Sequence, residues 1–396
     1  MVLSKRLSQI NPSATLAITA RAKKMKADGV DVISLGAGEP DFDTPENIKQ
    51  AAREALDNGF TKYTTASGTK ELKDAVVRKF KNDNNLQFAP EQIIISCGAK
   101  HALFNAILVL CQEGDEVIVP SPYWVSYPEM IKASGAKMVS LKTSPESNFK
   151  ITAAQLRKAI SKKTKLFILN SPSNPTGMVY TKQELADIAG LLIETGVVCI
   201  SDEIYEKIIY DGCEHISIAS LNGRLARQTV VVNGVSKAYS MTGWRIGYAA
   251  GPAEIIQAMS NLQSHSTSNP TSIAQKAALA ALSGPQESVI GMVKEFKKRR
   301  DYIVDRINKI KGISCIMPQG AFYLFVNIAG ILGKICRGKV IKDSFILAEI
   351  LLAEANIAVV PGSIFGDDNY LRLSYATSTD NITKGINRIE EFVGRL

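Results

Sequence analysis

Short apolar runs rich in β-branched residues recur along the first two-thirds of the chain, with helical patterns between them. The runs occupy residues 93–95, 117–119, 166–169, 197–200 and 230–232. They are apolar at successive positions, which is typical of strands buried on both faces of a mainly parallel sheet. Helical stretches such as 153–160 and 183–195 separate them. The alternation predicts an α/β fold whose sheet is covered by helices.

The pattern changes near Pro285. From Val289 to Ile310, apolar residues recur at helical spacing and predict one long amphipathic helix. Strand-like pieces and two more helical stretches follow, the strands at 322–326, 357–360 and 370–375. We therefore expect a second, smaller α+β domain. The first 45 or so residues also fit poorly into the regular alternation.

Charge and composition limit the classes of partner. Lys and Arg number 47 against 38 Asp and Glu, and the net charge of +9 favours anionic small molecules. The charges are scattered, and the densest run, 297–300, reads best as a solvated helix face, so we expect no nucleic-acid site. No apolar run approaches the roughly 20 residues of a membrane helix. Residues 1–8 show no apolar block behind their charges, so we expect no secretory signal, no membrane anchor and a cytoplasmic location.

The sequence lacks the motifs of two classes of enzyme, the zinc enzymes and the serine hydrolases. The chain has 6 cysteines and 3 histidines, with no C-x-x-C pair and no H-E-x-x-H motif. A protein-bound metal is therefore not expected. The G-x-S-x-G elbow of serine hydrolases is also missing from the sequence.

Polar side chains follow three of the expected strands where each strand ends. The segments are 170–177 with Asn174, 201–205 with Asp202 and Tyr205, and 233–237 with Ser236 and Lys237. Each has a simple structural explanation on its own: a turn, a helix cap and a loop lysine. Because the carboxyl ends of parallel strands meet at one crevice, their joint appearance instead indicates a ligand site.

This set of groups suits pyridoxal phosphate (PLP). The cofactor's aldehyde needs an amine, which only lysine supplies, and a buried carboxylate favours a protonated pyridine nitrogen. Asn amide and Tyr hydroxyl groups suit its phenolate oxygen. Gly98 follows the run 93–95 and opens a helix, which could cradle a phosphate or be a plain turn. Trp124 could stack on a flat ring or simply pack in a core.

Longer motifs show a family resemblance. Residues 234–247, Gly-Val-Ser-Lys-Ala-Tyr-Ser-Met-Thr-Gly-Trp-Arg-Ile-Gly, resemble the PLP-lysine motif of class-I aminotransferases. Segments 174–177, 202–205 and 371–374 match the same family in order and separation, and 38–45 and 122–128 resemble the bacterial aspartate aminotransferases of subgroup Ib. The resemblance covers essentially the whole chain. It implies fold-type I, with a large PLP-binding domain over 46–288, a small domain from residues 1–45 and 289–396, and a homodimer with shared active sites.

The resemblance also implies roles for individual residues. Lys237 is expected to bond the cofactor's aldehyde and to move the proton during transamination, and Asp202 to pair with the pyridine nitrogen. The other expected cofactor contacts are Tyr205 and Asn174 at the phenolate oxygen, Trp124 on the ring, and Gly98, Ala99, Ser236, Arg245 and the neighbouring subunit's Tyr63 at the phosphate. Arg372 is expected to clamp the substrate α-carboxylate with Gly38 and Asn174, because its planar fork matches a carboxylate.

The expected reaction is amino transfer from L-aspartate to 2-oxoglutarate. In subgroup Ib a lysine after the phosphate-binding glycine serves the distal carboxylate, and Lys100 matches it; its alternative is a helix-surface lysine. Members that also use prephenate resemble this chain at residues 12–15, but they usually carry a basic residue where this chain has Asn11. Prephenate, aromatic and alanine-type specificities therefore stay open. A PLP-binding transcription regulator, a β-lyase and a decarboxylase are the alternatives from other classes.

Overall fold

The computed structural model describes residues 7–12 and 14–396, and its central feature is a seven-stranded sheet. The strand order is β2-β8-β7-β6-β5-β3-β4. Strands β7 to β4 in that order run parallel, whereas β8 is antiparallel to both β7 and β2. The strands are β2 Ile93–Ser96, β3 Glu116–Ser121, β4 Lys137–Lys142, β5 Thr164–Asn170, β6 Val198–Asp202, β7 Thr229–Gly234 and β8 Gly247–Ala250. The predicted α/β fold with a mainly parallel sheet is confirmed.

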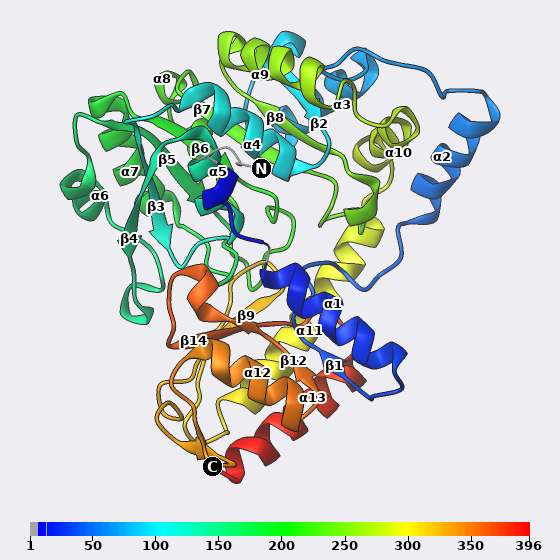
Figure 1. The fold of residues 1–396 in the computed structure, drawn as a ribbon. Coiled ribbons are helices and arrows are strands. Elements are labelled where there is room, and N and C mark those ends of the chain that lie inside the picture. The colour runs from blue at the N-terminus through cyan, green and yellow to red at the C-terminus, as the bar shows by residue number, and fades with distance from the viewer. Residues whose placement is uncertain (1–6, 13) are drawn as a thin grey trace.

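Helices cover both faces of this sheet (Figure 1). The helices of this part of the chain are α2 Glu46–Asp57, α3 Lys70–Asn84, α4 Ala99–Leu110, α5 Ser126–Ser134, α6 Ala153–Ala159, α7 Lys182–Thr195, α8 Gly223–Ala226, α9 Ala253–Ser266 and α10 Ser272–Ser283. Helix α2 lies at the margin and packs against α10. In β5, Leu166 and Ile168 share a core with α4, α5 and α9, while Phe167 and Leu169 share another with α6 and α7. Both faces of the strand are therefore buried, which explains why the strands read as unbroken apolar runs.

A second group of elements joins the two ends of the described chain. It contains the helices α1 Ala14–Ala27, α11 Glu287–Ile307, α12 Ser344–Glu354 and α13 Thr379–Gly394. Its strands are β1 Ile33–Ser34, β9 Tyr323–Asn327, β10 Ile335–Cys336, β11 Lys339–Val340, β12 Ile357–Ala358, β13 Val360–Pro361 and β14 Tyr370–Ser374. Strands β13, β14 and β9 form an antiparallel sheet in that order. The parallel pair β1-β12 places residues 33–34 beside 357–358 (Figure 1).

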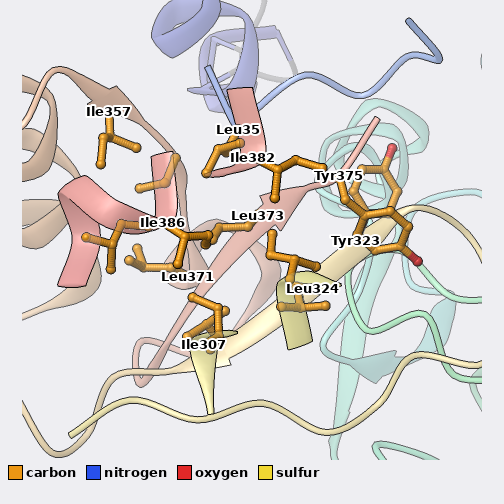
Figure 2. Packing of buried hydrophobic residues seen from close by; sticks show 14 of the residues in the cluster. Leu35, Ile307, Tyr323, Leu324, Ile357, Leu371, Leu373, Tyr375, Ile382 and Ile386 are labelled. Atoms are coloured by element: carbon orange, nitrogen blue, oxygen red, sulfur yellow. The ribbon is translucent and has the colours of Figure 1, made fainter. Parts of the chain in front are cut away.

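One apolar core holds this second group together. Leu324, Leu371 and Leu373 from the three-stranded sheet pack with Ile307 of α11 and Ile386 of α13 (Figure 2). Burying side chains of this size contributes about 1.5–3 kcal/mol each. The sequence pattern that predicted a smaller α+β unit thus corresponds to a real core, whereas the division at residues 45 and 288 stays a prediction.

The structure corrects several element boundaries. The expected strand 357–360 is two short strands, β12 and β13, which join different sheets. The long helix ends at Ile307, before Ile310. Strands β4 and β8 were not expected. Within the described residues, no helix is long and apolar enough to cross a bilayer.

Candidate active site

A cavity of about 400 Å³ opens between the carboxyl ends of the seven-stranded sheet and the three-stranded sheet. Asn170 and Asp202 end the neighbouring strands β5 and β6 in register, and Ser236 and Lys237 follow β7. Of the expected site residues, Gly38, Ala99, Lys100, Trp124, Asn174, Asp202, Tyr205, Ser236, Lys237, Arg245 and Arg372 all line this cavity. Tyr63 is 89% exposed and is not among the lining residues.

Lys237 lies partly buried in the loop after β7. Its Nζ donates a 2.5 Å hydrogen bond to the backbone oxygen of Gly38 and lies 5.9 Å from the ring centre of Tyr205. Burial and the positive charge of Arg372 lower the pKa of Lys237 to about 8. About a tenth of this amine is therefore uncharged at pH 7, far more than for an ordinary lysine, as a nucleophilic lysine requires.

Asp202 is a buried carboxylate held by two donors. The Tyr127 hydroxyl donates to Oδ2 at 2.6 Å, and the backbone N–H of Ile204 donates to Oδ1 at 3.3 Å. Burial raises the pKa of Asp202 to about 6 even though Tyr127 opposes the shift. The carboxylate thus lacks a close cationic partner among the described residues and is suited to receive one from a ligand.

Arg372 is a buried cation, only 3% exposed, at the cavity wall. Its guanidinium donates to Oδ1 of Asn174 at 3.1 Å and to the backbone oxygen of Gly36 at 2.9 Å. Nε has no hydrogen-bond partner, and no carboxylate of the described chain pairs with the group. A buried guanidinium bound only by neutral acceptors has free capacity for an anion.

The start of α4 and Arg245 form a second anion-binding corner. Gly98 precedes the helix with φ of +90°, a conformation that favours glycine, and a Cβ there would lie 2.4 Å from Arg245 Nη2 and displace the guanidinium. Arg245 donates to the backbone oxygens of Thr242 at 2.8 Å and Cys97 at 3.3 Å. A helix N-terminus beside an arginine is a favourable phosphate site.

The mouth of the cavity carries a tryptophan and two further cations. Lys100 Nζ lies 5.1 Å from the ring centre of Trp124, and burial and then Arg245 lower its pKa. The exposed Lys23 of α1 also lines the cavity. Neither lysine has an ion pair or a hydrogen bond among the described residues. Asn11, by contrast, bonds the Glu129 carboxylate and does not line the cavity, and Ser13 lies outside the described residues.

A comparison of the sequence with protein families identifies the family of this chain. The sequence model described as "Aminotransferase class I and II" matches residues 30–389. The chain belongs to this family.

Individual class I and II aminotransferases resemble the chain over its full length. An aspartate aminotransferase from Bacillus sp. (strain YM-2) is 53% identical over 99% of both chains. An aspartate/prephenate aminotransferase from Nitrosomonas europaea is 47% identical over 98% of this chain and 99% of that relative. The crystal structure of the aspartate aminotransferase from Rhizobium meliloti matches with a TM-score of 0.96 at 45% identity over 100% of both chains. The expected family, fold and enzyme class are therefore confirmed.

The enzymes of this family use PLP, and the cavity of this aminotransferase fits that group. It offers a lysine with a lowered pKa, a buried carboxylate without a close cation, and a helix N-terminus beside Arg245. These match the aldehyde, the pyridine nitrogen and the phosphate of PLP respectively. The roles of the single residues remain proposals.

The cavity also contains residues that the sequence analysis did not assign. Tyr127 lies inside the segment 122–128, yet only the fold shows its hydrogen bond to Asp202. Tyr323 lines the wall, and Glu39 and Asn170 lie close by. Asn170 Oδ1 accepts from the backbone N–H of Asn174 at 2.8 Å, which fixes the turn that follows β5. The Tyr127–Asp202 contact joins residues far apart in the sequence and therefore leaves no spacing motif.

A buried charge cluster lies beyond β6, next to Asp202 in sequence. Glu203, Glu206 and His215 bring possible metal-ligating atoms within 4.8 Å of one another. Lys79 forms an ion pair with Glu206, and Glu203 accepts hydrogen bonds from Ser217 and Ser201 at 2.7 and 2.8 Å. The lysine already balances one carboxylate, so we interpret the cluster as structural.

Proposed function

We propose that the protein is an aspartate aminotransferase, which transfers the amino group of L-aspartate to 2-oxoglutarate and gives oxaloacetate and L-glutamate. The observation that carries this proposal is the pair of cations in one cavity, Arg372 and Lys100, which lack carboxylate partners among the described residues. A dicarboxylate supplies one anion for each. The 53% identical Bacillus aspartate aminotransferase supports the same substrate.

The roles of the residues follow from their chemistry. The chemistry that PLP would supply when bound is an electron sink and a temporary acceptor for the amino group. Lys237 supplies the amine that holds the cofactor and then carries a proton, since its pKa of about 8 lets it act as acid or base near neutrality. Asp202 keeps the pyridine nitrogen protonated, while Tyr205 and Asn174 donate to the phenolate oxygen.

Binding and orientation fall to the remaining residues. Trp124 covers the cofactor ring, and Gly98, Ala99, Ser236 and Arg245 hold its phosphate. Arg372, with Gly38 and Asn174, binds the α-carboxylate of the substrate, and Lys100 binds the distal carboxylate. Two cations in one cavity would favour a substrate with a carboxylate at each end over a monocarboxylate.

We also propose a homodimer that works in the cytoplasm. Tyr63 is 89% exposed and lies away from its own cavity, which suits a residue that reaches the phosphate of a neighbouring subunit. A hollow lined by Trp244, Arg245 and Thr271 opens beside the phosphate corner and offers an entry for it. Sedimentation equilibrium tests the dimer, and mixing Lys237→Ala chains, which should be inactive, with Tyr63→Phe chains, which should bind the cofactor more weakly, should restore tight cofactor binding at one of the two sites of the mixed dimer if the sites are shared.

One observation favours a second candidate, an aminotransferase that also accepts prephenate. Lys23 places a cation at the cavity mouth, although Asn11 is not basic. The ring carboxylate of prephenate is as many bonds from its keto acid end as the distal carboxylate of 2-oxoglutarate, so a site that binds 2-oxoglutarate has the cations that prephenate needs, and Lys23 adds a further positive charge. The 47% identical aspartate/prephenate aminotransferase supports this second candidate.

A donor and acceptor panel tests both candidates. Initial rates with aspartate, glutamate, alanine and phenylalanine, and with 2-oxoglutarate, oxaloacetate and prephenate as acceptors, should give aspartate with 2-oxoglutarate the highest kcat/KM. Product analysis for keto acid against ammonia and CO₂ separates transamination from lyase and decarboxylase chemistry. Lys237→Ala should lose both the activity and the covalently held chromophore. Alanine or phenylalanine used as well as aspartate would refute the dicarboxylate proposal.

A further inference from the structure

Tyr323 is a second tyrosine in the cavity wall, and it touches Tyr205 directly. It begins β9 in the three-stranded sheet and is 1% exposed. The two hydroxyl oxygens lie 2.8 Å apart, and the rings meet edge to face with their centres 5.7 Å apart. The pair therefore connects the three-stranded sheet to the loop after β6 through one buried hydrogen bond.

The direction of this hydrogen bond follows from counting protons. A tyrosine hydroxyl has one proton to donate and two lone pairs that accept. If Tyr205 donates its proton to an oxygen in the cavity, it can only accept from Tyr323. Tyr323 then becomes the first donor in a series, and hydrogen bonds in series strengthen one another in a buried site.

Arg372 lies against the other side of Tyr323. Its guanidinium carbon is 4.3 Å from the centre of the Tyr323 ring. Burial raises the pKa of Tyr323, and the positive charge of Arg372 is the largest opposing influence. A nearby cation makes a phenol a better hydrogen-bond donor, so the arrangement favours Tyr323 as donor toward Tyr205.

We propose that Tyr323 is a positioning residue that donates its hydroxyl proton to Tyr205 and thereby aims the Tyr205 hydroxyl at the phenolate oxygen of the cofactor. The inference rests on the proposed role of Tyr205. Tyr323 also supports Arg372, because its ring packs against the guanidinium that is proposed to bind the substrate carboxylate. Tyr323 thus links the two halves of the site without itself touching the reacting atoms.

Removal of the Tyr323 hydroxyl should be visible in the cofactor spectrum. Without the Tyr323 hydroxyl, Tyr205 is a weaker hydrogen-bond donor and leaves more negative charge on the phenolate oxygen of the cofactor. The proton that this oxygen shares with the Lys237 nitrogen bonded to the cofactor is then released at higher pH. One neutral hydrogen bond corresponds to a shift of about half a pH unit or more. Tyr323→Phe keeps the ring contacts to Tyr205 and Arg372 and removes only the hydroxyl.

The test is an absorbance titration of the holoenzyme from pH 5 to 10 for the wild type, Tyr323→Phe, Tyr205→Phe and the double variant. We expect Tyr323→Phe to move the midpoint upward, Tyr205→Phe to move it further, and the double variant to match Tyr205→Phe. A midpoint for Tyr323→Phe equal to that of the wild type, or additive shifts in the double variant, would overturn the proposal.

Tyr375→Phe is a matched control. Tyr375 belongs to the same core as Tyr323 and is fully buried, but its hydroxyl bonds the backbone oxygen of Ala321 at 3.1 Å and does not line the cavity (Figure 2). Its loss should leave the midpoint unchanged, which separates a specific effect from general loosening of the core. A wild-type protein that showed no pH-dependent chromophore would instead count against the proposed function and against the role of Tyr205.

Discussion

Oδ1 of Asn174 accepts a 3.1 Å hydrogen bond from Arg372, and this bond crosses from the turn after β5 to the three-stranded sheet. It orients a cation that has no carboxylate partner among the described residues. The amide thereby holds the guanidinium in place before any substrate arrives. Preorganisation of this kind reduces the entropy lost on binding.

Arg372→Lys should lower kcat/KM for every amino donor by roughly a hundredfold or more. A lysine cannot form two parallel bonds to a carboxylate, and charge-assisted hydrogen bonds contribute about 1.5–3 kcal/mol each. Steady-state kinetics with aspartate and alanine should show the same loss for both. Arg388→Lys, which changes an arginine bound to Asp31 outside the cavity, serves as the control. A loss confined to aspartate would contradict the α-carboxylate role.

Lys100→Ala should change specificity rather than general activity. Loss of one charge-assisted bond to the distal carboxylate should reduce kcat/KM for aspartate about 10-fold to 100-fold and leave alanine nearly unchanged. The ratio of the two constants is the measurement. Lys24→Ala removes an exposed lysine of α1 and should leave both constants unaltered. Equal losses for aspartate and alanine would show that Lys100 does not recognise the distal group.

Asp202→Asn should stabilise the cofactor-free protein at neutral pH. The pKa of Asp202 is about 6 in the folded protein, above the 3.8 of a solvated aspartate. Ionisation of the folded state therefore becomes unfavourable as pH rises between these values, and the cost approaches about 3 kcal/mol above pH 6. The gain of the variant in free energy of unfolding should be small near pH 4 and largest above pH 6. Urea unfolding of both apo-proteins at pH 4 and 7.5 measures it, and a pH-independent difference would contradict the assignment.

Lys79→Met should destabilise the fold while leaving substrate specificity intact. Burial opposes ionisation of Glu206, but Lys79 and His215 outweigh it and lower its pKa to about 2. Removing the lysine from a buried ion pair costs about 3–5 kcal/mol. Denaturant unfolding should detect this loss, and the Lys79→Met, Glu206→Leu double variant should recover most of it. An unaltered free energy of unfolding for the single variant would show that water reaches the cluster.

The sequence was most informative where a pattern is local. The runs at 166–169 and 230–232 are buried on both faces, so they read clearly as strands β5 and β7. Strand β4 was missed because all of its residues are exposed or half-buried at the sheet edge, and β8, Gly-Tyr-Ala-Ala, has little β propensity of its own. Their places depend on neighbouring strands rather than on their own residues.

The same distinction applies to the site. Lys237, Asp202 and Asn174 follow strand ends and were found by that position. Tyr323 and Tyr127 act through contacts with residues far away in the sequence, and their own surroundings look like ordinary core. The wrong strand at 357–360 has a related cause, because one apolar run is shared by two sheets.

The cavity wall is shared by two sheets, because Arg372 lies on β14 of the three-stranded sheet, whereas Asp202 ends β6 and Lys237 follows β7 of the seven-stranded sheet. A molecule that touches all three is a mechanical tie between them. The two sheets should therefore be held together more firmly when metabolites occupy the cavity, and the protein should be less rigid when metabolite concentrations are low.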